Sequence, residues 1–315
     1  MKDPRVRIHA ASLHYFDAVR RAGSIRAAAR RLNVASSAVN RQILALEAEV
    51  QSPLFDRLPG GLKLTAAGEI LAHHVIGVLR DAERVQSELA ALRGLETGHV
   101  DIVTLEGVCH RILPAAIAAA HLRSPRVTIS VGILSTEDIP RAIVEGEAHL
   151  GLAFEVRRRP DLRLIAARKF RLGAVVLPGS PLAREASLSV GALREHRLIL
   201  PKANFANRLQ LQSALDPEKF AAAGRTEVGS IDLMKQLVLR GLGVGLMTVV
   251  GLEDEVESGR LIHVPLRQGR GYLESELGLY ARADTALPLA AEMFAQHLVG
   301  VLAEAGSQTS RTSSE

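Results

Sequence analysis

Residues Ser24 to Glu47, SIRAAARRLNVASSAVNRQILALE, predict two helices joined by a tight turn. Apolar residues recur at i, i+3, i+4 and i+7 in the first half, which is the spacing of one helix face; they are Ile25, Ala28, Ala29 and Leu32. Ser24 stands directly before this face, where its side-chain oxygen can cap free backbone N–H groups. Asn33 and Val34 interrupt the pattern, and because Asn tolerates turn geometry, we expect the first helix to end here.

The second helix should begin at Ser36 or Ser37, either of which can cap it, and its apolar stripe comprises Ala38, Val39, Ile43 and Leu46. Its opposite face carries Ser36, Ser37, Asn40 and Arg41. Arg can form two hydrogen bonds with guanine, Asn can do so with adenine, and Ser lets the helix approach closely. This pattern is typical of a helix-turn-helix that enters a major groove. A pair of surface helices in an ordinary helical domain is the alternative.

The flanking residues extend this pattern in both directions. They are Phe16-Asp17-Ala18-Val19, Gly23-Ser24, Ala27-Ala28, Leu32, Ser37 to Ile43, Leu46-Glu47, Pro53 to Arg57, Leu62 to Thr65 and Ala67-Gly68-Glu69. Over about the first seventy residues the chain closely resembles the LysR-type transcriptional regulators of bacteria, and beyond them it does so by general plan. Two departures, at Ala35-Ser36 and at Asn40, lie on the expected base-contacting face, so the operator sequence cannot be taken from a relative.

The expected fold is α/β overall, because strand and helix patterns alternate from Val100 onwards. The resemblance implies an all-α winged helix-turn-helix with a linker helix, followed by a two-lobed α/β effector domain like that of type 2 periplasmic binding proteins. The expected boundaries are 1–65 for the DNA-binding domain, 66–96 for the linker and dimerisation helix, 97–305 for the effector domain (lobe I about 97–165 and 266–305, lobe II about 166–265), and 306–315 for a disordered tail.

Basic residues are concentrated at the N-terminal end. Residues 1–58 contain ten Lys and Arg and five Asp and Glu, and their net charge of +5 equals that of the whole chain. A basic segment on a neutral body is the electrostatic footprint of phosphate binding. Arg57 and Lys63 lie in a predicted hairpin, the wing, which would pass near the DNA backbone or minor groove. The predicted DNA-binding residues are Ser24, Arg26, Ser36, Ser37, Asn40, Arg41, Arg57 and Lys63.

A long helix is predicted from Thr65 to about Arg93. Its apolar residues alternate at spacings of four and three, an unbroken heptad repeat that implies a partner helix. Packing onto the chain's own core is the alternative, but a two-fold dimer would pair two recognition helices with two half-sites. We therefore expect a homodimer, and a homotetramer by resemblance. The predicted dimerisation residues are Leu71, Val75, Val78, Ala82, Val85, Leu89 and Leu92.

Ligands of open α/β sheets bind beyond the carboxyl ends of strands, near helix N-termini. By resemblance, four such loops line an inducer cleft, and each of their polar groups could instead be only a helix cap. Glu106 would disfavour a carboxylate ligand unless it is paired, which points to an amine-bearing or hydroxylated effector. The predicted effector-binding residues are Thr104, Glu106, Ser135, Thr136, Asn204 and Ser230.

Composition narrows the classes of function. Aromatic residues make up only 3% of the chain, which argues against a single-strand binder that stacks bases. No apolar run approaches the roughly twenty residues of a membrane helix, and the N-terminus lacks the apolar region of a secretory signal. The single cysteine, Cys109, fits a reducing cytoplasm and a core position. We expect a cytoplasmic protein without catalytic residues, metal or cofactor, and therefore not an enzyme.

The expected partners are double-stranded promoter DNA, a small-molecule effector and a second copy of the chain, and RNA polymerase is left open as a further partner. Two other classes keep part of the pattern. A solute-binding protein would keep the cleft but needs export. A ligand-independent architectural DNA-binding protein would keep the basic arm but has no use for a cleft. An enzyme fused to the arm would need a catalytic constellation, and the sequence shows none.

Overall fold

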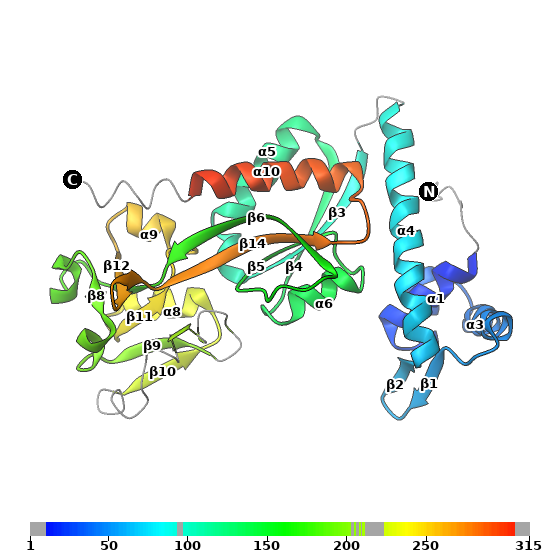
Figure 1. Cartoon of the computed structure of the whole chain (residues 1–315), viewed down its shortest axis with the longest axis horizontal. Helices are drawn as coiled ribbons and strands as arrows, with labels where there is room; N and C mark the ends of the chain where they lie inside the picture. The colour runs from blue at the N-terminus through cyan, green and yellow to red at the C-terminus, as the bar shows by residue number, and fades with distance from the viewer. Residues whose placement is uncertain are drawn as a thin grey trace. The chain divides into compact units, whose positions relative to one another are not determined.

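The computed structural model describes residues 11–92, 97–202, 205, 208, 210–211 and 224–305. The chain forms two compact units, which we describe separately (Figure 1). Unit 1 comprises Met1–Leu95 and Asp284–Leu289, and unit 2 comprises Glu96–Ala283 and Ala290–Glu315. The tail 306–315, for which disorder is predicted, and Asn204 lie outside the described residues.

Unit 1 is a winged helix-turn-helix followed by a long helix. Its elements are α1 (Ala11–Ala22), α2 (Ile25–Leu32), α3 (Ser36–Val50), β1 (Phe55–Leu58), β2 (Gly61–Leu64) and α4 (Ala66–Leu92). Asn33 ends α2 in the left-handed conformation, with φ 54° and ψ 47°. β1 and β2 pair antiparallel at one end of α4 (Figure 1). The predicted turn, hairpin and long helix are therefore confirmed.

The core of unit 1 lies where the three N-terminal helices meet the start of α4. Phe16, Val19, Val39 and Val75 have no exposed surface, and Leu54 is almost as buried. This apolar contact fixes the orientation of α3, because the stripe that faces the core determines which side chains face solvent.

Two polar side chains, Glu47 and Thr65, attach the hairpin to the helices by hydrogen bonds. A Glu47 carboxylate oxygen accepts from the Leu54 amide at 2.7 Å. The Thr65 hydroxyl donates to the Pro53 carbonyl at 2.7 Å and accepts from the Gly68 amide at 3.0 Å. A Cβ at Gly68 would lie 2.2 Å from the Leu54 carbonyl oxygen, so only glycine fits there. Glu47, Thr65 and Gly68, which all belong to the quoted motif, therefore have structural roles.

Unit 2 contains a five-stranded sheet in the order β4-β3-β5-β14-β6. β3 pairs parallel with β4 and β5, while β14 runs antiparallel to β5 and β6. The elements of this first lobe are β3 (Thr97–Thr104), the 3-10 helix η1 (Glu106–Cys109), α5 (Ile112–Arg123), β4 (Arg126–Ile133), α6 (Asp138–Val144), β5 (Leu150–Phe154), β6 (Leu162–Arg171), β14 (Glu274–Arg282) and α10 (Leu289–Ala305).

The second lobe of unit 2 is built on a seven-stranded sheet in the order β10-β9-β11-β7-β12-β13, with β8 paired to β12. Its elements are β7 (Gly173–Val176), η2 (Pro181–Arg184), β8 (Leu188–Ser189), η3 (Val190–Leu193), β9 (Leu198–Pro201), β10 (Arg225–Val228), α8 (Ile231–Leu239), β11 (Val244–Met247), α9 (Glu253–Glu257), β12 (Ile262–Gln268) and β13 (Gly271–Tyr272). The α/β class and the two-lobed plan are thus confirmed.

The chain crosses between the lobes twice, and both crossings differ from the predicted positions. The expected boundaries at residues 166 and 266 fall inside β6 and β12. The crossings lie at Leu172 and Leu273, where the Leu172 amide donates to the Leu273 carbonyl at 2.8 Å. β6 is an edge strand with much exposed surface. Four basic residues interrupt its apolar ones, so it lacks the continuous apolar run that indicates a buried strand.

Candidate nucleic-acid interface and effector cleft

The N-terminus of α3 is open. Its N-cap residue is Ala35, which forms no side-chain capping hydrogen bond. The prediction that Ser36 or Ser37 caps α3 is therefore wrong: both lie inside its first turn, and both are exposed. In the described part of the chain, their hydroxyl groups have no hydrogen-bond partner. Because the first N–H groups of a helix lack intrahelical partners, this turn presents several donors to an external acceptor.

The exposed face of α3 carries the predicted base-contacting groups. Val39, Ile43 and Leu46 are buried, so the helix turns Arg41 outward, and Asn40 keeps part of its surface exposed. No described residue pairs with the Arg41 guanidinium. Arg41 is therefore free to form two hydrogen bonds with a base or a phosphate.

The cations of unit 1 fall into two groups. Arg20 and Arg21 form ion pairs with Asp17 at 2.8 and 2.7 Å, so much of their charge is neutralised within α1. A second group is exposed and has no ion-pair partner among the described residues; it comprises Arg26, Arg30, Arg31, Arg41, Arg57 and Lys63. Arg30 and Arg31 were not predicted as DNA-binding residues, although the count of basic residues included them. The unpaired charges make this surface suitable for a polyanion.

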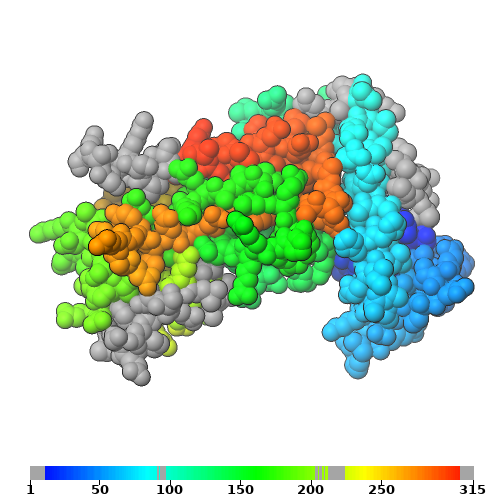
Figure 2. Space-filling model, in the orientation of Figure 1, coloured from blue at the N-terminus to red at the C-terminus, as the bar shows by residue number. Residues whose placement is uncertain are grey.

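Ser24 and the hairpin complete the predicted set. The Ser24 hydroxyl accepts from the Ala27 amide at 3.5 Å, which confirms the predicted cap of α2. In the hairpin, Lys63 lies opposite Asp56 in the strand register. The Leu62 amide donates to the Gly23 carbonyl at 2.8 Å, which ties the wing to the turn between α1 and α2. Figure 2 shows atoms of this N-terminal part at the surface of unit 1.

The heptad repeat of α4 serves more than one purpose. Val75 is completely buried in the core of unit 1, and Leu71 packs against the same core. Val75 therefore cannot contact a partner helix, contrary to the prediction. Leu89 and Leu92, near the other end of α4, are 44% and 84% exposed. The alternative of packing onto the chain's own core thus holds for the beginning of the helix, while its end keeps an exposed apolar surface.

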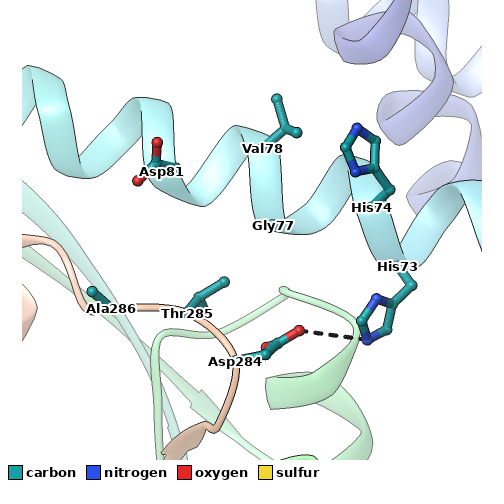
Figure 3. Close-up of a pocket in the computed structure, with 8 residues that line it drawn as sticks. All are labelled: His73, His74, Gly77, Val78, Asp81, Asp284, Thr285 and Ala286. Atoms are coloured by element: carbon teal, nitrogen blue, oxygen red, sulfur yellow. Dashed lines mark ion pairs between the residues drawn. The ribbon is translucent and has the colours of Figure 1, made fainter.

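An open pocket of about 440 Å³ also lies in unit 1 (Figure 3). Nε2 of His73 lies 3.4 Å from a carboxylate oxygen of Asp284, whereas His74 points away from it. Neighbouring residues of a helix point about 100° apart, so these two histidines do not converge on one metal ion. Among the described residues there is no group of three or more side chains that could hold a metal.

In unit 2, Glu106 extends from the first lobe to the second. One of its carboxylate oxygens accepts from the Ser230 hydroxyl at 2.9 Å and from the Asp232 amide at 3.4 Å. The other accepts from the Ile231 amide at 3.0 Å. Glu106 is thus paired with donors of the protein itself. The sequence argument assumed an unpaired acid in the cleft, so it does not by itself define the effector. Because the donors come from the second lobe, Glu106 and Ser230 join the two lobes at the N-terminus of α8.

The other predicted cleft residues have different environments. Thr104, a predicted effector-binding residue, is fully buried and donates to the Leu152 carbonyl at 3.2 Å, so its hydroxyl does not face a cleft. Ser135 donates to Asp138 at 2.7 Å and accepts from its amide at 3.3 Å, as a cap does. Hydrogen bonds from Ser135 and Arg141 lower the pKa of Asp138. The buried Thr136 hydroxyl, by contrast, has no described partner.

Two further features adjoin η1. Burial, and secondarily the charge of Glu106, raise the pKa of the Cys109 thiol, which disfavours the reactive thiolate. Arg111 forms a two-fold hydrogen-bonded ion pair with Glu257 of the second lobe. This bond to Arg111 is the main cause of the lowered pKa of Glu257. Residues 97–123 therefore contact the second lobe through Arg111 as well as through Glu106.

Known proteins share both parts of this architecture. Residues 11–69 match the family model "Bacterial regulatory helix-turn-helix protein, lysR family", and residues 93–303 match "LysR substrate binding domain". The RuBisCO operon transcriptional regulator of Acidithiobacillus ferrooxidans is 27% identical over 82% of this chain and 85% of its own length. The CbbR regulator of Sinorhizobium medicae is 27% identical over 79% and 80%, respectively.

Solved structures show the same fold. A full-length OxyR variant from Pseudomonas aeruginosa has a TM-score of 0.71 at 18% identity, covering 92% of this chain and 95% of its own. CbnR in complex with its target DNA has a TM-score of 0.52 at 22% identity, covering 93% and 99%. No helix among the described residues is long and apolar enough to cross a membrane. The chain belongs to the LysR family of transcriptional regulators, and it is a DNA-binding regulator with an effector-binding domain.

Proposed function

We propose that α3 enters the major groove of promoter DNA with its N-terminal turn foremost. The observation that carries this proposal is the open first turn with the exposed Ser36 and Ser37, followed one turn later by the exposed and unpaired Arg41. Arg41 and Asn40 would contact base edges, and the two serines would allow close approach. Ser24 lies at the start of α2, where its amide and hydroxyl would face the DNA backbone.

The unpaired cations outside α3 would hold the phosphate backbone. Arg26, at the start of α2, and Arg57 and Lys63, in the hairpin, are exposed and have no described partner. Contacts to phosphate position a protein on DNA without selecting a sequence. We assign these three residues to positioning, and Asn40 and Arg41 to sequence selection.

Selection from random DNA duplexes with the full-length protein tests the assignment. We expect the enriched sites to contain two related half-sites about one helical turn apart, as a two-fold dimer requires. The Arg41→Ala variant should enrich sites that differ at one base pair of each half-site, whereas Lys63→Ala should enrich the wild-type sites. Enrichment of no sequence by the wild-type protein would contradict the proposal and favour an architectural DNA-binding protein.

We further propose that the end of α4 associates with a second copy of the chain. Leu89 and Leu92 are exposed apolar residues of the heptad repeat, and such a repeat is stabilised by a partner helix. Leu89→Glu should shift the protein from dimer to monomer in light scattering. Leu122→Glu is the matched control, because Leu122 is 89% exposed but lies on α5. An unchanged dimer in Leu89→Glu would refute this assignment.

A small molecule bound between the lobes of unit 2 would modulate DNA binding. Thr136 supports this proposal, because its buried hydroxyl has no described partner. Thr136 follows β4 as Glu106 follows β3. Because these two strands are parallel neighbours, both residues lie beyond the carboxyl ends of the strands, on the same side of the sheet. Asn204 stays a predicted effector contact, and the cytoplasm stays the predicted location. RNA polymerase stays open as a further partner.

Thermal melting of the full-length protein against a metabolite panel tests the effector proposal. A ligand at a hundred times its dissociation constant adds about 2.7 kcal/mol to the stability of the unit it binds. The shift should be smaller in Thr136→Val than in the control Ser130→Ala, since Ser130 is exposed on β4. Equal shifts in both variants would exclude Thr136, and a ligand that leaves promoter binding unchanged would contradict a regulatory role.

A further inference from the structure

The Glu106 carboxylate occupies the position where an anionic ligand would bind at the N-terminus of α8. Its three donors are the Ser230 hydroxyl and the Ile231 and Asp232 amides. Backbone amides at a helix start, together with the positive end of the helix dipole, form the usual anion site of α/β proteins. Here the chain supplies the anion itself, from a residue 124 positions earlier in the sequence.

The backbone around Glu106 is in close contact with the second lobe. A Cβ at Gly107 would lie 3.2 Å from the Val250 carbonyl oxygen. Gly251, with φ +92°, would place a Cβ 3.1 Å from the Gly107 Cα. The two loops therefore touch through glycine backbone, and Glu106 is held close to α8 before its side chain forms any hydrogen bond.

Other acidic groups near this end of α8 are already engaged. Asp232 pairs with Lys235 at 3.2 Å, and Lys235 also lies 3.4 Å from Glu255. Glu253 accepts from the Gly251 amide at 2.8 Å, and its pKa is raised mainly by burial. Of these carboxylates, Glu106 is the one that the structure places on the first amides of α8.

We propose that the Glu106 carboxylate acts as an internal ligand of the effector cleft. It holds the two lobes together, and it makes the cleft select effectors that place no carboxylate at the start of α8. This inference rests on the proposed effector cleft. A carboxylate tethered beside its site has a high effective concentration, so a free carboxylate competes poorly with it. A second anion would also meet the charge of Glu106, and like charges placed together oppose binding.

The proposal defines the effector class by charge. An effector that leaves Glu106 in place must be neutral or cationic where it approaches the start of α8. Removing the side chain would leave the Ser230, Ile231 and Asp232 donors facing the cleft, and a carboxylate from solution could then take its place. Glu106 is thus expected to determine specificity.

Hydrogen exchange of the full-length protein tests the clasp. The amides at the start of α8 should exchange about tenfold faster in Glu106→Ala than in the wild type, a factor equivalent to losing one charge-assisted hydrogen bond. Glu106→Gln, which keeps an acceptor, should be intermediate and guards against a folding defect in the alanine variant. Glu137→Ala is the matched control, because Glu137 is an exposed glutamate of the same lobe. Equal exchange in all four proteins would overturn the clasp.

Acetate tests the selectivity. At constant ionic strength, acetate should slow exchange at the start of α8 in Glu106→Ala, and it should have no effect in the wild type or in Glu106→Gln, where a side chain fills the site. Slowing of equal size in the wild type, or none in Glu106→Ala, would overturn the selectivity. Promoter binding measured on the same wild-type preparation keeps the two proposals apart: its absence would contradict the proposed function whatever the exchange rates show.

Discussion

The N-termini of α3 and α8 are built from similar residues but have opposite surroundings. α3 begins with Ser36 after an alanine N-cap that forms no side-chain hydrogen bond, and its first turn contains no acidic residue. α8 begins after Ser230, whose hydroxyl accepts from the Leu233 amide at 3.2 Å. The Glu106 carboxylate from the other lobe accepts from the Ile231 and Asp232 amides, the first two of the helix.

The difference follows from a property that all helices share. The first backbone N–H groups of a helix have no partner within it, so they bind whichever acceptor is nearest. At α8 the acceptor belongs to the chain, and the result is a joint between lobes. At α3 the described chain supplies no side-chain acceptor, so the turn is left for an external one. A helix start whose amides bind an acceptor of the chain itself is a structural joint. A helix start without such an acceptor can serve as a recognition surface.

A carboxylate placed at the start of α3 should occupy its free amides, as Glu106 does at α8. We expect this change to cause the largest loss of DNA affinity. Ser37→Glu would put a negative charge in the exposed first turn, where it interacts favourably with the helix dipole but repels phosphate. Like-charge contacts at an interface cost several kcal/mol, so we expect affinity for the selected DNA site to fall by about a hundredfold or more while the melting temperature is unchanged or raised. Fluorescence anisotropy and calorimetry measure the two quantities.

The control for that substitution is Ser130→Glu, which adds the same charge to an exposed position of unit 2. It should leave DNA affinity unchanged. Retention of wild-type affinity by Ser37→Glu would show that the start of α3 does not approach DNA, and the comparison with α8 would then lose its functional meaning.

The next largest loss of DNA affinity is expected from removing the proposed base contact of Arg41. Arg41→Ala should cost about 1–3 kcal/mol on the selected site and much less on random DNA, because a base contact distinguishes sequences and a phosphate contact does not. Competition binding with both DNAs measures the difference. Arg163→Ala, an exposed arginine on β6, is the control. Equal losses on both DNAs would assign Arg41 to the phosphate backbone.

The two helix starts were not equally predictable from sequence. The elements around α3 follow from local features: the apolar period of α2, Asn33 in the left-handed conformation, and the Ser24 cap. Sequence patterns alone could not decide between Ala35 and the following serines as the cap of α3. That choice depends on where the backbone leaves the extended conformation, and helix ends are commonly uncertain by a residue or two.

The surroundings of α8 depend on long-range contacts, which local periodicity does not contain. Glu106 and Ser230 are 124 residues apart. The sequence placed both near the cleft, but their pairing exists only because η1 touches α8. Thr104 was misassigned for a similar reason. It lies at the carboxyl end of β3, where ligands of α/β sheets usually bind, yet β4 and β5 flank the strand on both sides and bury it.

A smaller effect distinguishes the two serine caps. Ser230→Ala should destabilise unit 2 by about 1–2 kcal/mol, at the upper end for an N-cap, because the hydroxyl also donates to Glu106. Ser24→Ala should cost about 0.5–1 kcal/mol in unit 1, since its capping bond is long at 3.5 Å. Urea unfolding followed by hydrogen exchange in each unit measures both losses. Similar costs would indicate that the bond between Ser230 and Glu106 adds nothing to the cap.

The smallest expected loss of DNA affinity comes from removing the Lys63 charge, which would contact phosphate and not bases. Lys63 is exposed in the hairpin and has no described partner, so its ammonium group can approach a phosphate but has no fixed geometry for a base. Lys63→Ala should weaken binding equally on all sequences and reduce by about 1 the slope of log affinity against log salt concentration. Ser37→Glu should lower affinity and also change this slope, because it adds a charge where DNA approaches. An unchanged slope in Lys63→Ala would place the hairpin away from the DNA and leave the open turn of α3, with the cations of α2 and α3, as the contact surface of unit 1.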